Sequence, residues 1–277
     1  MTVRGAPAPM EHLALFLHGW PAHAAEAMAP PDIEVEPRPD GGFTVRIHGP
    51  ARAAMECDSA LDAANAVAGA AVAVQVARDP RLVCIHGAAA LLPAGLVALV
   101  GESGAGKSSL ALLLASAGHV LFGDDRVALR LPAEGAAEPV EGISVGLAPK
   151  MRLPLPPGCG DAFARYVEAR TAYAGETAAY LRPQPGEAAR PGARAALAAI
   201  VVLDRGGGEA ALVRLGAADT IRALISHCFA PHIPAERMVG ALDRLSRRVP
   251  VWRLGFAASA EAAALLAKGF ARPGRDG

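Results

Sequence analysis

The sequence has no excess of either charge, because 27 lysines and arginines balance 27 aspartates and glutamates in 277 residues. Without a long-range field of one sign, binding to nucleic acid or to an anionic membrane is disfavoured. Charged residues are also few, at 19% of the chain against 52% apolar residues. This composition excludes a disordered chain and predicts a folded protein with a sizeable core, and the 30 glycines and 23 prolines predict many turns.

Cysteine is scarce in the sequence, and the four residues lie far apart. No two of them form a C-x-x-C pair, which excludes a zinc ribbon and a dense disulfide framework. We therefore expect reduced thiols and a cytoplasmic protein. The four residues are Cys57, Cys84, Cys159 and Cys228.

Long apolar runs are missing as well. The longest, Gly87–Gly101, is interrupted by Pro93 and Gly95 and is shorter than the roughly 18 residues of a membrane-spanning helix. Near the N-terminus the apolar run Leu13–Leu17 is shorter than the core of a signal peptide. We expect neither a transmembrane segment nor secretion.

Segment 1–80 predicts a small α+β domain appended to a larger one. Segments 33–36 and 43–47 alternate between apolar and polar residues around a turn rich in proline and glycine, a pattern typical of a β-hairpin. Segment 58–78 is rich in alanine and has Asp58 or Ser59 as the N-cap. It predicts a helix whose closely packed face needs no large side chains.

Segment 81–277 predicts a layered α/β domain, because a strand, a glycine-rich loop, a helix and another strand follow in close succession. Two strands around the glycines 206–208 are expected to form a hairpin, since no helix follows as a phosphate loop would require. Segment 132–195 shows little periodicity and predicts long loops and short elements near a substrate site. The expected strands are 82–85, 96–100, 120–122, 198–203, 210–215 and 251–256, and the expected helices are 107–117, 218–229, 234–248 and a last one from Ser259.

The most specific motif is Gly101–Ser108, which satisfies G-x-x-x-x-G-K-[ST] between a predicted strand and a predicted helix. Its glycines let backbone N–H groups point at phosphate oxygens, and the helix N-terminus adds partial positive charge. Lys107 is expected on the β- and γ-phosphates and Ser108 on Mg²⁺. The motif therefore predicts ATP and Mg²⁺ as cofactors. The residues expected to bind the nucleotide are Gly101, Ser103, Gly104, Ala105, Gly106, Lys107, Ser108 and Ser109.

Two adjacent carboxylates, Asp124 and Asp125, follow the next predicted strand. Carboxylates at a strand end can divide their labour, because one can hold Mg²⁺ while the other takes the proton of an acceptor. We assign Asp124 to the metal together with Ser108, and Asp125 to the role of general base. The sequence alone leaves the reverse assignment open.

These residues resemble the catalytic domain of the HPr kinase/phosphorylase family. The likeness rests on the glycine-rich motif with its Ser-Leu-Ala-Leu continuation, the Ala-Gly-His at 117–119, the Gly-Asp-Asp-Arg-Val at 123–127 and the Ile-His-Gly-Ala at 85–88. The resemblance implies a P-loop kinase core of the HPr kinase and phosphoenolpyruvate carboxykinase type. It also implies that His86 assists Asp125.

Two cations in the segment 148–152, Lys150 and Arg152, lie where such kinases place a segment over the phosphates. Either can neutralise charge on the transferred phosphoryl group.

Two departures from the family disfavour HPr itself as the acceptor. The segment Glu141–Ile143 lacks the arginine of the family's second signature, and segment 1–80 does not resemble its regulatory domain.

The chain is therefore most similar to divergent HPr-kinase-like proteins, some of which phosphorylate a serine on precursors of ribosomally made peptides, including lasso peptides. The expected function is Mg·ATP-dependent phosphorylation of a serine on a peptide or protein, with neither nucleic acid nor membrane as partner. A homo-oligomer is compatible with this fold. Two alternatives remain: a kinase of the same fold with a small-molecule acceptor, and a nucleotide-binding scaffold or sensor without catalysis.

Overall fold

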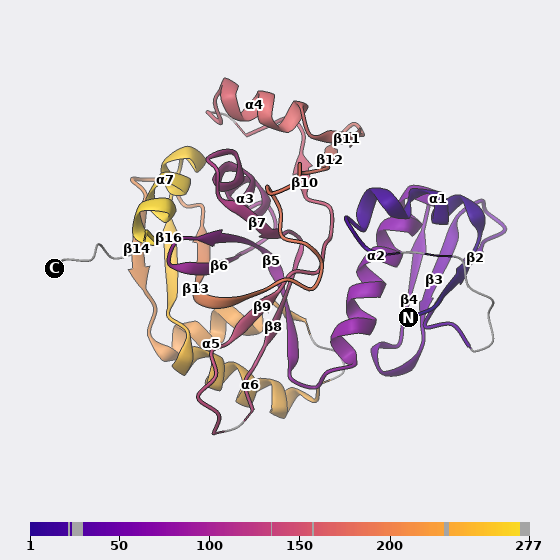
Figure 1. The fold of residues 1–277 in the computed structure, drawn as a ribbon, viewed down its shortest axis with the longest axis horizontal. Helices are drawn as coiled ribbons and strands as arrows, with labels where there is room; N and C mark the ends of the chain where they lie inside the picture. The colour runs from indigo at the N-terminus through magenta and orange to yellow at the C-terminus, as the bar shows by residue number, and fades with distance from the viewer. Residues whose placement is uncertain (22, 24–29, 134, 157, 230–232, 272–277) are drawn as a thin grey trace.

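The computed structural model describes residues 1–271 apart from 22, 24–29, 134, 157 and 230–232. It is a mixed α/β protein with a smaller N-terminal part beside a larger core (Figure 1). The predicted domain boundary at position 80 falls in the connection between helix α2 (Ala60–Ala77) and strand β5 (Leu82–Leu92).

The N-terminal part is a four-stranded sheet with helix α2 against one face and helix α1 beside α2. Its strand order is β1-β2-β3-β4, in which only β1 and β2 run parallel. The predicted hairpin is confirmed, because β2 and β3 pair from Ile33 opposite Ile47 to Pro37 opposite Phe43. The bounds are β1 Val3–Gly5, α1 Pro7–Phe16, β2 Ile33–Pro37, β3 Phe43–Ile47, the 3₁₀ turn Gly49–Ala51 and β4 Ala53–Cys57.

Helix α2 has the predicted N-cap, since the Ser59 hydroxyl accepts a hydrogen bond from the backbone N–H of Asp62 (3.1 Å). By length and composition it is the one helix of the described residues that could cross a membrane, and half of it is buried in the protein. Its alanines and valines contact the sheet, α1 and the core. Small side chains therefore let α2 pack closely against three neighbours.

The core is built on a nine-stranded mixed sheet. Seven strands follow the order β14-β16-β13-β6-β5-β8-β9, and β7 and β15 also pair with β5. Strand β13 runs parallel to β6 and β16, whereas the other pairs are antiparallel. The bounds are β6 Gly95–Val100, β7 Val120–Gly123, β8 Arg126–Arg130, β9 Glu141–Ile143, β13 Arg194–Asp204, β14 Ala211–Arg214, β15 Cys228–Phe229 and β16 Val251–Gly255.

Helices cover both faces of this sheet, which makes the core three layers deep (Figure 1). Side chains of β6 alternate between the layers: Val97 and Leu99 pack with α3 and α7, whereas Ala98 and Val100 pack with α5 and α6. All four side chains are fully buried. The strand that leads into the glycine-rich loop is therefore held from both sides. The helices are α3 Lys107–Ser116, α5 Ala217–Ile225, α6 Ala235–Arg248 and α7 Ser259–Gly269.

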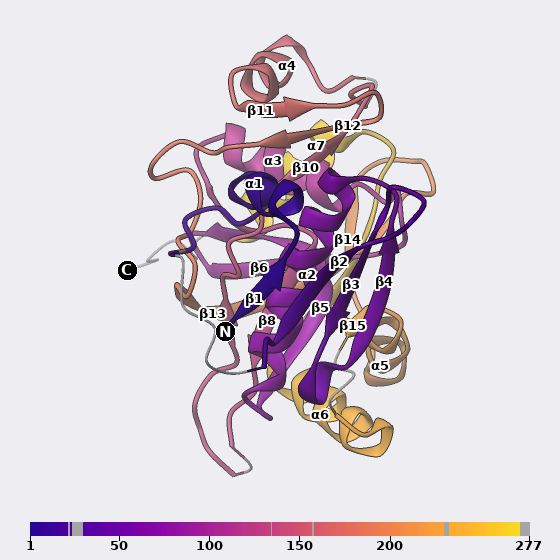
Figure 2. The same cartoon turned by 90° about the vertical axis from the view of Figure 1, so that its right-hand side faces the viewer.

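A small sheet and helix α4 project from the core beside α3 (Figure 2). The strand order is β10-β12-β11, and all pairs are antiparallel. Met151 of β10 is 1% exposed and packs into the same cluster as α3. These short elements lie in segment 132–195, for which long loops and short elements are predicted. The bounds are β10 Lys150–Arg152, α4 Asp161–Glu168, β11 Thr171–Ala174 and β12 Ala178–Leu181.

The predicted hairpin around glycines 206–208 is wrong. Both strands exist, but β16 lies between β13 and β14 and pairs with each of them. The physical reason is burial: β16 carries the buried Val251 and Leu254, whereas β14 is largely exposed and forms the edge of the sheet. The glycines therefore belong to a connection that passes over a neighbouring strand.

Two predicted boundaries also differ from the structure. The strand predicted for 82–85 continues to Leu92, because glycine inside it allows close pairing with β6: a Cβ at Gly87 would lie 2.4 Å from the carbonyl oxygen of Leu99. The helix predicted for 218–229 ends at Ile225, and Cys228 and Phe229 form β15 against β5.

Candidate functional site

The glycine-rich loop, residues 101–106, connects β6 to the N-terminus of α3. It curls through three glycines with φ values of 153° at Gly101, 85° at Gly104 and 100° at Gly106, a region that other L-residues rarely adopt. A Cβ at Gly101 would also lie 3.0 Å from the carbonyl oxygen of Leu203 in β13. The curvature of this loop therefore depends on glycine at the positions that the motif requires.

Lys107 begins α3, and its side chain folds back over the loop. Its Nζ donates hydrogen bonds to the carbonyl oxygens of Gly101 (2.8 Å) and Glu102 (3.0 Å). Burial lowers the pKa of Lys107, and the charges of Asp124 and Glu102 partly oppose this shift. The amine is thus held inside the loop, where phosphate oxygens could replace the carbonyl oxygens as its acceptors.

Asp124 is a buried carboxylate that contacts α3 and β10. It is 2% exposed and accepts hydrogen bonds from the Ser108 hydroxyl (2.7 Å) and the Lys150 backbone N–H (2.9 Å). Burial raises the pKa of Asp124, although both hydrogen bonds favour the ionised form. Two hard oxygen donors, the Ser108 hydroxyl and the Asp124 carboxylate, therefore lie together beside the glycine-rich loop.

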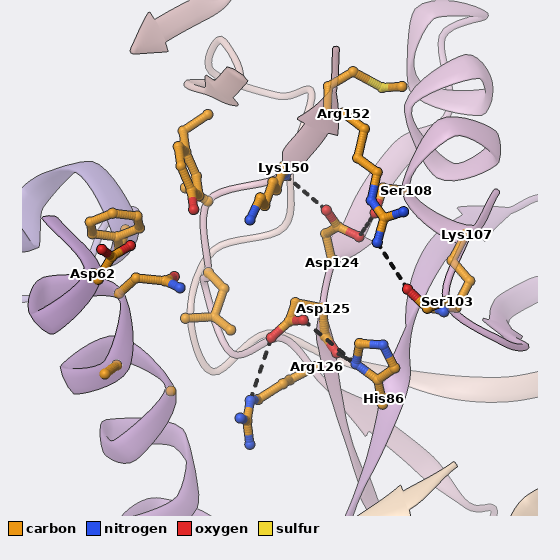
Figure 3. A pocket seen from close by; sticks show the side chains of 18 of the residues that line it. Asp62, His86, Ser103, Lys107, Ser108, Asp124, Asp125, Arg126, Lys150 and Arg152 are labelled. Carbon is orange, nitrogen blue, oxygen red and sulfur yellow. Dashed lines mark hydrogen bonds and ion pairs between the residues drawn. The ribbon is translucent and has the colours of Figure 1, made fainter. Parts of the chain in front are cut away.

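Asp125 has the opposite environment, with its side chain 53% exposed. Its φ of 64° makes it the one non-glycine residue with positive φ in the described chain. His86 Nδ1 lies 3.0 Å from the Asp125 carbonyl oxygen and 3.5 Å from Oδ1, and Arg126 Nε lies 3.5 Å from Oδ2 (Figure 3). The backbone therefore turns two successive carboxylates in different directions, one inward and one toward the solvent.

The two predicted cations reach the site from β10 (Figure 3). Arg152 donates a hydrogen bond to the Ser103 hydroxyl in the glycine-rich loop (2.9 Å). The Lys150 Nζ lies 5.4 Å from the centre of the Tyr180 ring, within the range of a cation–π contact. The structure therefore brings both side chains to the site, Arg152 in direct contact with the loop.

Polar groups of two residues expected to bind the nucleotide, Ala105 and Ser109, make contacts within the protein. The Ser109 side chain is buried, and its hydroxyl is directed at the Met151 sulfur at 4.0 Å. The backbone N–H of Ala105 donates to the Glu102 carbonyl oxygen within the loop (3.1 Å). Neither group is aimed outward in this structure.

The site opens into a cavity of about 890 Å³ that the core and the N-terminal part line together. The two parts are joined next to it, since Ala148 N–H donates to the Phe16 carbonyl oxygen (2.8 Å) and His18 N–H to that of Gly146 (2.7 Å). Seven lining residues with polar side chains are not among the predicted site residues. Of these, Arg126 alone carries a local signal, because it follows the two aspartates in the sequence. The seven are Arg52, Glu56, Asp62, Asn65, Arg126, Tyr180 and Arg205.

Comparison with known proteins identifies no family. No family model matches the chain, and no curated protein does. Among solved structures the chain is similar to the "Hpr(Ser) kinase/phosphatase from Coxiella burnetii", with 13% sequence identity and a TM-score of 0.30 over 70% of this chain and 82% of that one. This is a distant likeness in fold, and the function proposed below depends on the geometry of the chain's own residues.

Proposed function

We propose that this protein is a Mg·ATP-dependent kinase that transfers the γ-phosphoryl group to a serine hydroxyl of a peptide or protein. The observation that carries the proposal is the opposite exposure of two successive carboxylates beside the glycine-rich loop. Asp124 is 2% exposed and bonded to Ser108, whereas the side chain of Asp125 is 53% exposed and faces the cavity. Such a pair separates a metal ligand from a general base.

The glycine-rich loop and Lys107 hold the nucleotide in this proposal. The Lys107 amine leaves the carbonyl oxygens of Gly101 and Glu102 for the β- and γ-phosphates, and the N-terminus of α3 adds its partial charge. The contact of Arg152 with Ser103 of the loop supports a role for this arginine in neutralising charge on the transferred group.

The Ser108 hydroxyl and the Asp124 carboxylate fit Mg²⁺, because both are oxygen donors and lie 2.7 Å apart. When bound there, the ion would neutralise phosphate charge and orient the β- and γ-phosphates. The Lys150 backbone N–H fixes the second oxygen of Asp124, so the carboxylate is oriented before any ligand arrives.

Asp125 is the proposed general base. It accepts the proton of the acceptor hydroxyl while that oxygen bonds to the γ-phosphorus, the bond to the bridging oxygen breaks, and ADP leaves. His86, whose Nδ1 lies 3.5 Å from Oδ1, orients the carboxylate as a positioning residue.

A small hydroxyl compound is the second candidate for the acceptor, because a cavity of about 890 Å³ also suits a small molecule. The deciding experiment incubates the protein with γ-labelled ATP and Mg²⁺ and offers serine peptides, HPr and small alcohols separately. We expect a gain of one phosphate on serine peptides, measured by mass spectrometry. Transfer to small alcohols or HPr alone would contradict the peptide assignment, and transfer to none of them would favour a nucleotide-binding scaffold.

A further inference from the structure

Strand β4 (Ala53–Cys57) has a free edge beside the candidate site. Within the described residues it is the terminal strand of its sheet and pairs with β3 alone, in continuous register without a bulge. A free edge presents unpaired backbone N–H and C=O groups to any extended chain. Charged residues, proline or a bulge commonly block such edges. Strand β4 reads Ala-Ala-Met-Glu-Cys and has neither proline nor a bulge, and its one charged side chain, Glu56, pairs with Arg38 (3.3 Å).

One stripe of helix α2 forms the floor next to this edge. The stripe follows the helical spacing of three and four positions, so its members lie on one face. Most of them are glycine or alanine, which leaves space above the helix. The members that line the cavity are Asp62, Asn65, Ala66, Gly69, Ala70 and Ala73.

The side chains of β4 continue the same wall. Ala53, Met55 and Cys57 line the cavity and alternate along the strand, so they share its α2-facing side, and Glu56 also contributes to the lining. On the opposite side of the cavity lie Asp125 and Lys150, while Asp62 on α2 faces them (Figure 3). The result is a groove, here called the β4 groove, with α2 as its floor, β4 as one wall and the candidate site as the other.

The floor of the groove is linked to the proposed base. A Cβ at Gly69 would lie 3.3 Å from Nη2 of Arg126, and the Arg126 Nε lies 3.5 Å from Oδ2 of Asp125. Glycine in the middle of a helix such as α2 costs about 1 kcal/mol relative to alanine. At Gly69 the missing side chain makes room for Arg126, which contacts Asp125. The groove is therefore continuous with the candidate site.

We propose that the β4 groove binds an extended segment of the peptide acceptor, which pairs with β4 as a fifth strand and presents its serine hydroxyl to Asp125. This inference rests on the proposed function and names how the acceptor is recognised. Main-chain pairing explains the open strand edge, and the small floor residues explain where the peptide's side chains fit. Arg52 precedes β4, whereas Glu56 and Asp62 lie at and after its other end, so the groove has opposite charges at its two ends and would orient a charged peptide.

The test compares two neighbouring alanines of β4. Both are exposed, but the Ala53 side chain lines the cavity whereas that of Ala54 lies on the other face of the strand. The probe is a synthetic mixture of short peptides with one central serine and randomised flanks. Ala53→Trp should lower kcat/KM for these peptides at least tenfold, and Ala54→Trp should change it less than twofold. In both variants the ATP affinity and the Tm should match those of the wild type. Equal kcat/KM values in the two variants would refute peptide binding in the β4 groove.

Hydrogen–deuterium exchange of the wild-type protein with the same peptides gives a readout that does not need catalysis. Peptide binding should slow exchange in β4. Protection of β4 without phosphate transfer would support the groove and refute the proposed function. Phosphate transfer without protection of β4 would support the proposed function and refute the groove. Neither protection nor transfer would overturn both. Protection of β4 that rises with protein concentration in the absence of peptide would also overturn the inference, because a second copy of the chain would then occupy the edge.

Discussion

Replacing Asp124 with asparagine should stabilise the metal-free protein while removing its response to Mg²⁺. Asparagine can keep both contacts, since its carbonyl oxygen accepts from the Lys150 N–H and its amide donates to the Ser108 hydroxyl. The change therefore removes little except a charge on a 2% exposed side chain. Burial of such a charge costs several kcal/mol, partly offset by its stronger hydrogen bonds. We expect a net gain of about 1–2 kcal/mol, or roughly 2–8 °C in Tm.

The pH dependence of this gain follows from the direction of the pKa shift. Burial raises the pKa of Asp124 above its value in the unfolded chain, so the ionised carboxylate destabilises the fold above the raised pKa. That penalty disappears as the pH falls through the raised pKa toward 3.8. The Tm difference between Asp124→Asn and wild type should therefore be largest at neutral pH and shrink in acid.

Thermal unfolding measured by circular dichroism in EDTA, and again with Mg²⁺, tests this prediction. Added Mg²⁺ should stabilise the wild type, by about 2.7 kcal/mol at a hundred times the dissociation constant, and leave Asp124→Asn unchanged. Equal Tm values in EDTA at neutral pH, together with equal Mg²⁺ responses, would refute the view that Asp124 is a buried charge suited to a cation.

Three further predictions concern the nucleotide and the fold. Lys107→Ala should weaken ATP binding at least tenfold in calorimetry, because it removes the cation inside the glycine-rich loop; unchanged affinity would exclude that loop as the phosphate site. Ser59→Ala removes the N-cap of α2 and should lower the free energy of unfolding in urea by about 1 kcal/mol. An unchanged free energy of unfolding would show that the cap is redundant. Leu99→Ala should lower the free energy of unfolding by about 2–5 kcal/mol, because the Leu99 side chain is 0% exposed. Val213, which is 60% exposed, serves as the control, and Val213→Ala should change the free energy of unfolding by less than about 0.5 kcal/mol. Similar changes in the two variants would contradict the layer assignment.

Local motifs predicted much of the candidate site. The glycine-rich loop, its helix and the following strand are adjacent in sequence, so the meeting of Ser108 with Asp124 follows from a short strand-loop-helix-strand unit. His86 was placed near Asp125 by family resemblance, and the structure brings the two together through strand β5. The opposite exposure of the two aspartates was not predictable, because it depends on the positive φ of Asp125.

Long-range pairing explains what the sequence analysis missed. The insertion of β16 between β13 and β14 joins segments that are distant in the sequence, and no turn signal encodes it. The β4 groove likewise needs three separate elements, and its floor consists largely of alanines and a glycine that read only as a closely packed helix. The position of Arg126 beside Gly69 joins the core to helix α2, and no local pattern at either residue predicts that contact.

The measurement that tests the central claim most directly is phosphate transfer by Asp125→Asn. If Asp125 is the general base, this variant should keep ATP affinity within a few-fold of the wild type and lose about 10²–10⁴ in turnover of serine peptides. His86 contacts this carboxylate only to position it, and His86→Asn leaves the proposed base in place. The loss of turnover in His86→Asn should therefore be smaller than in Asp125→Asn. Normal peptide phosphorylation by Asp125→Asn would contradict the account.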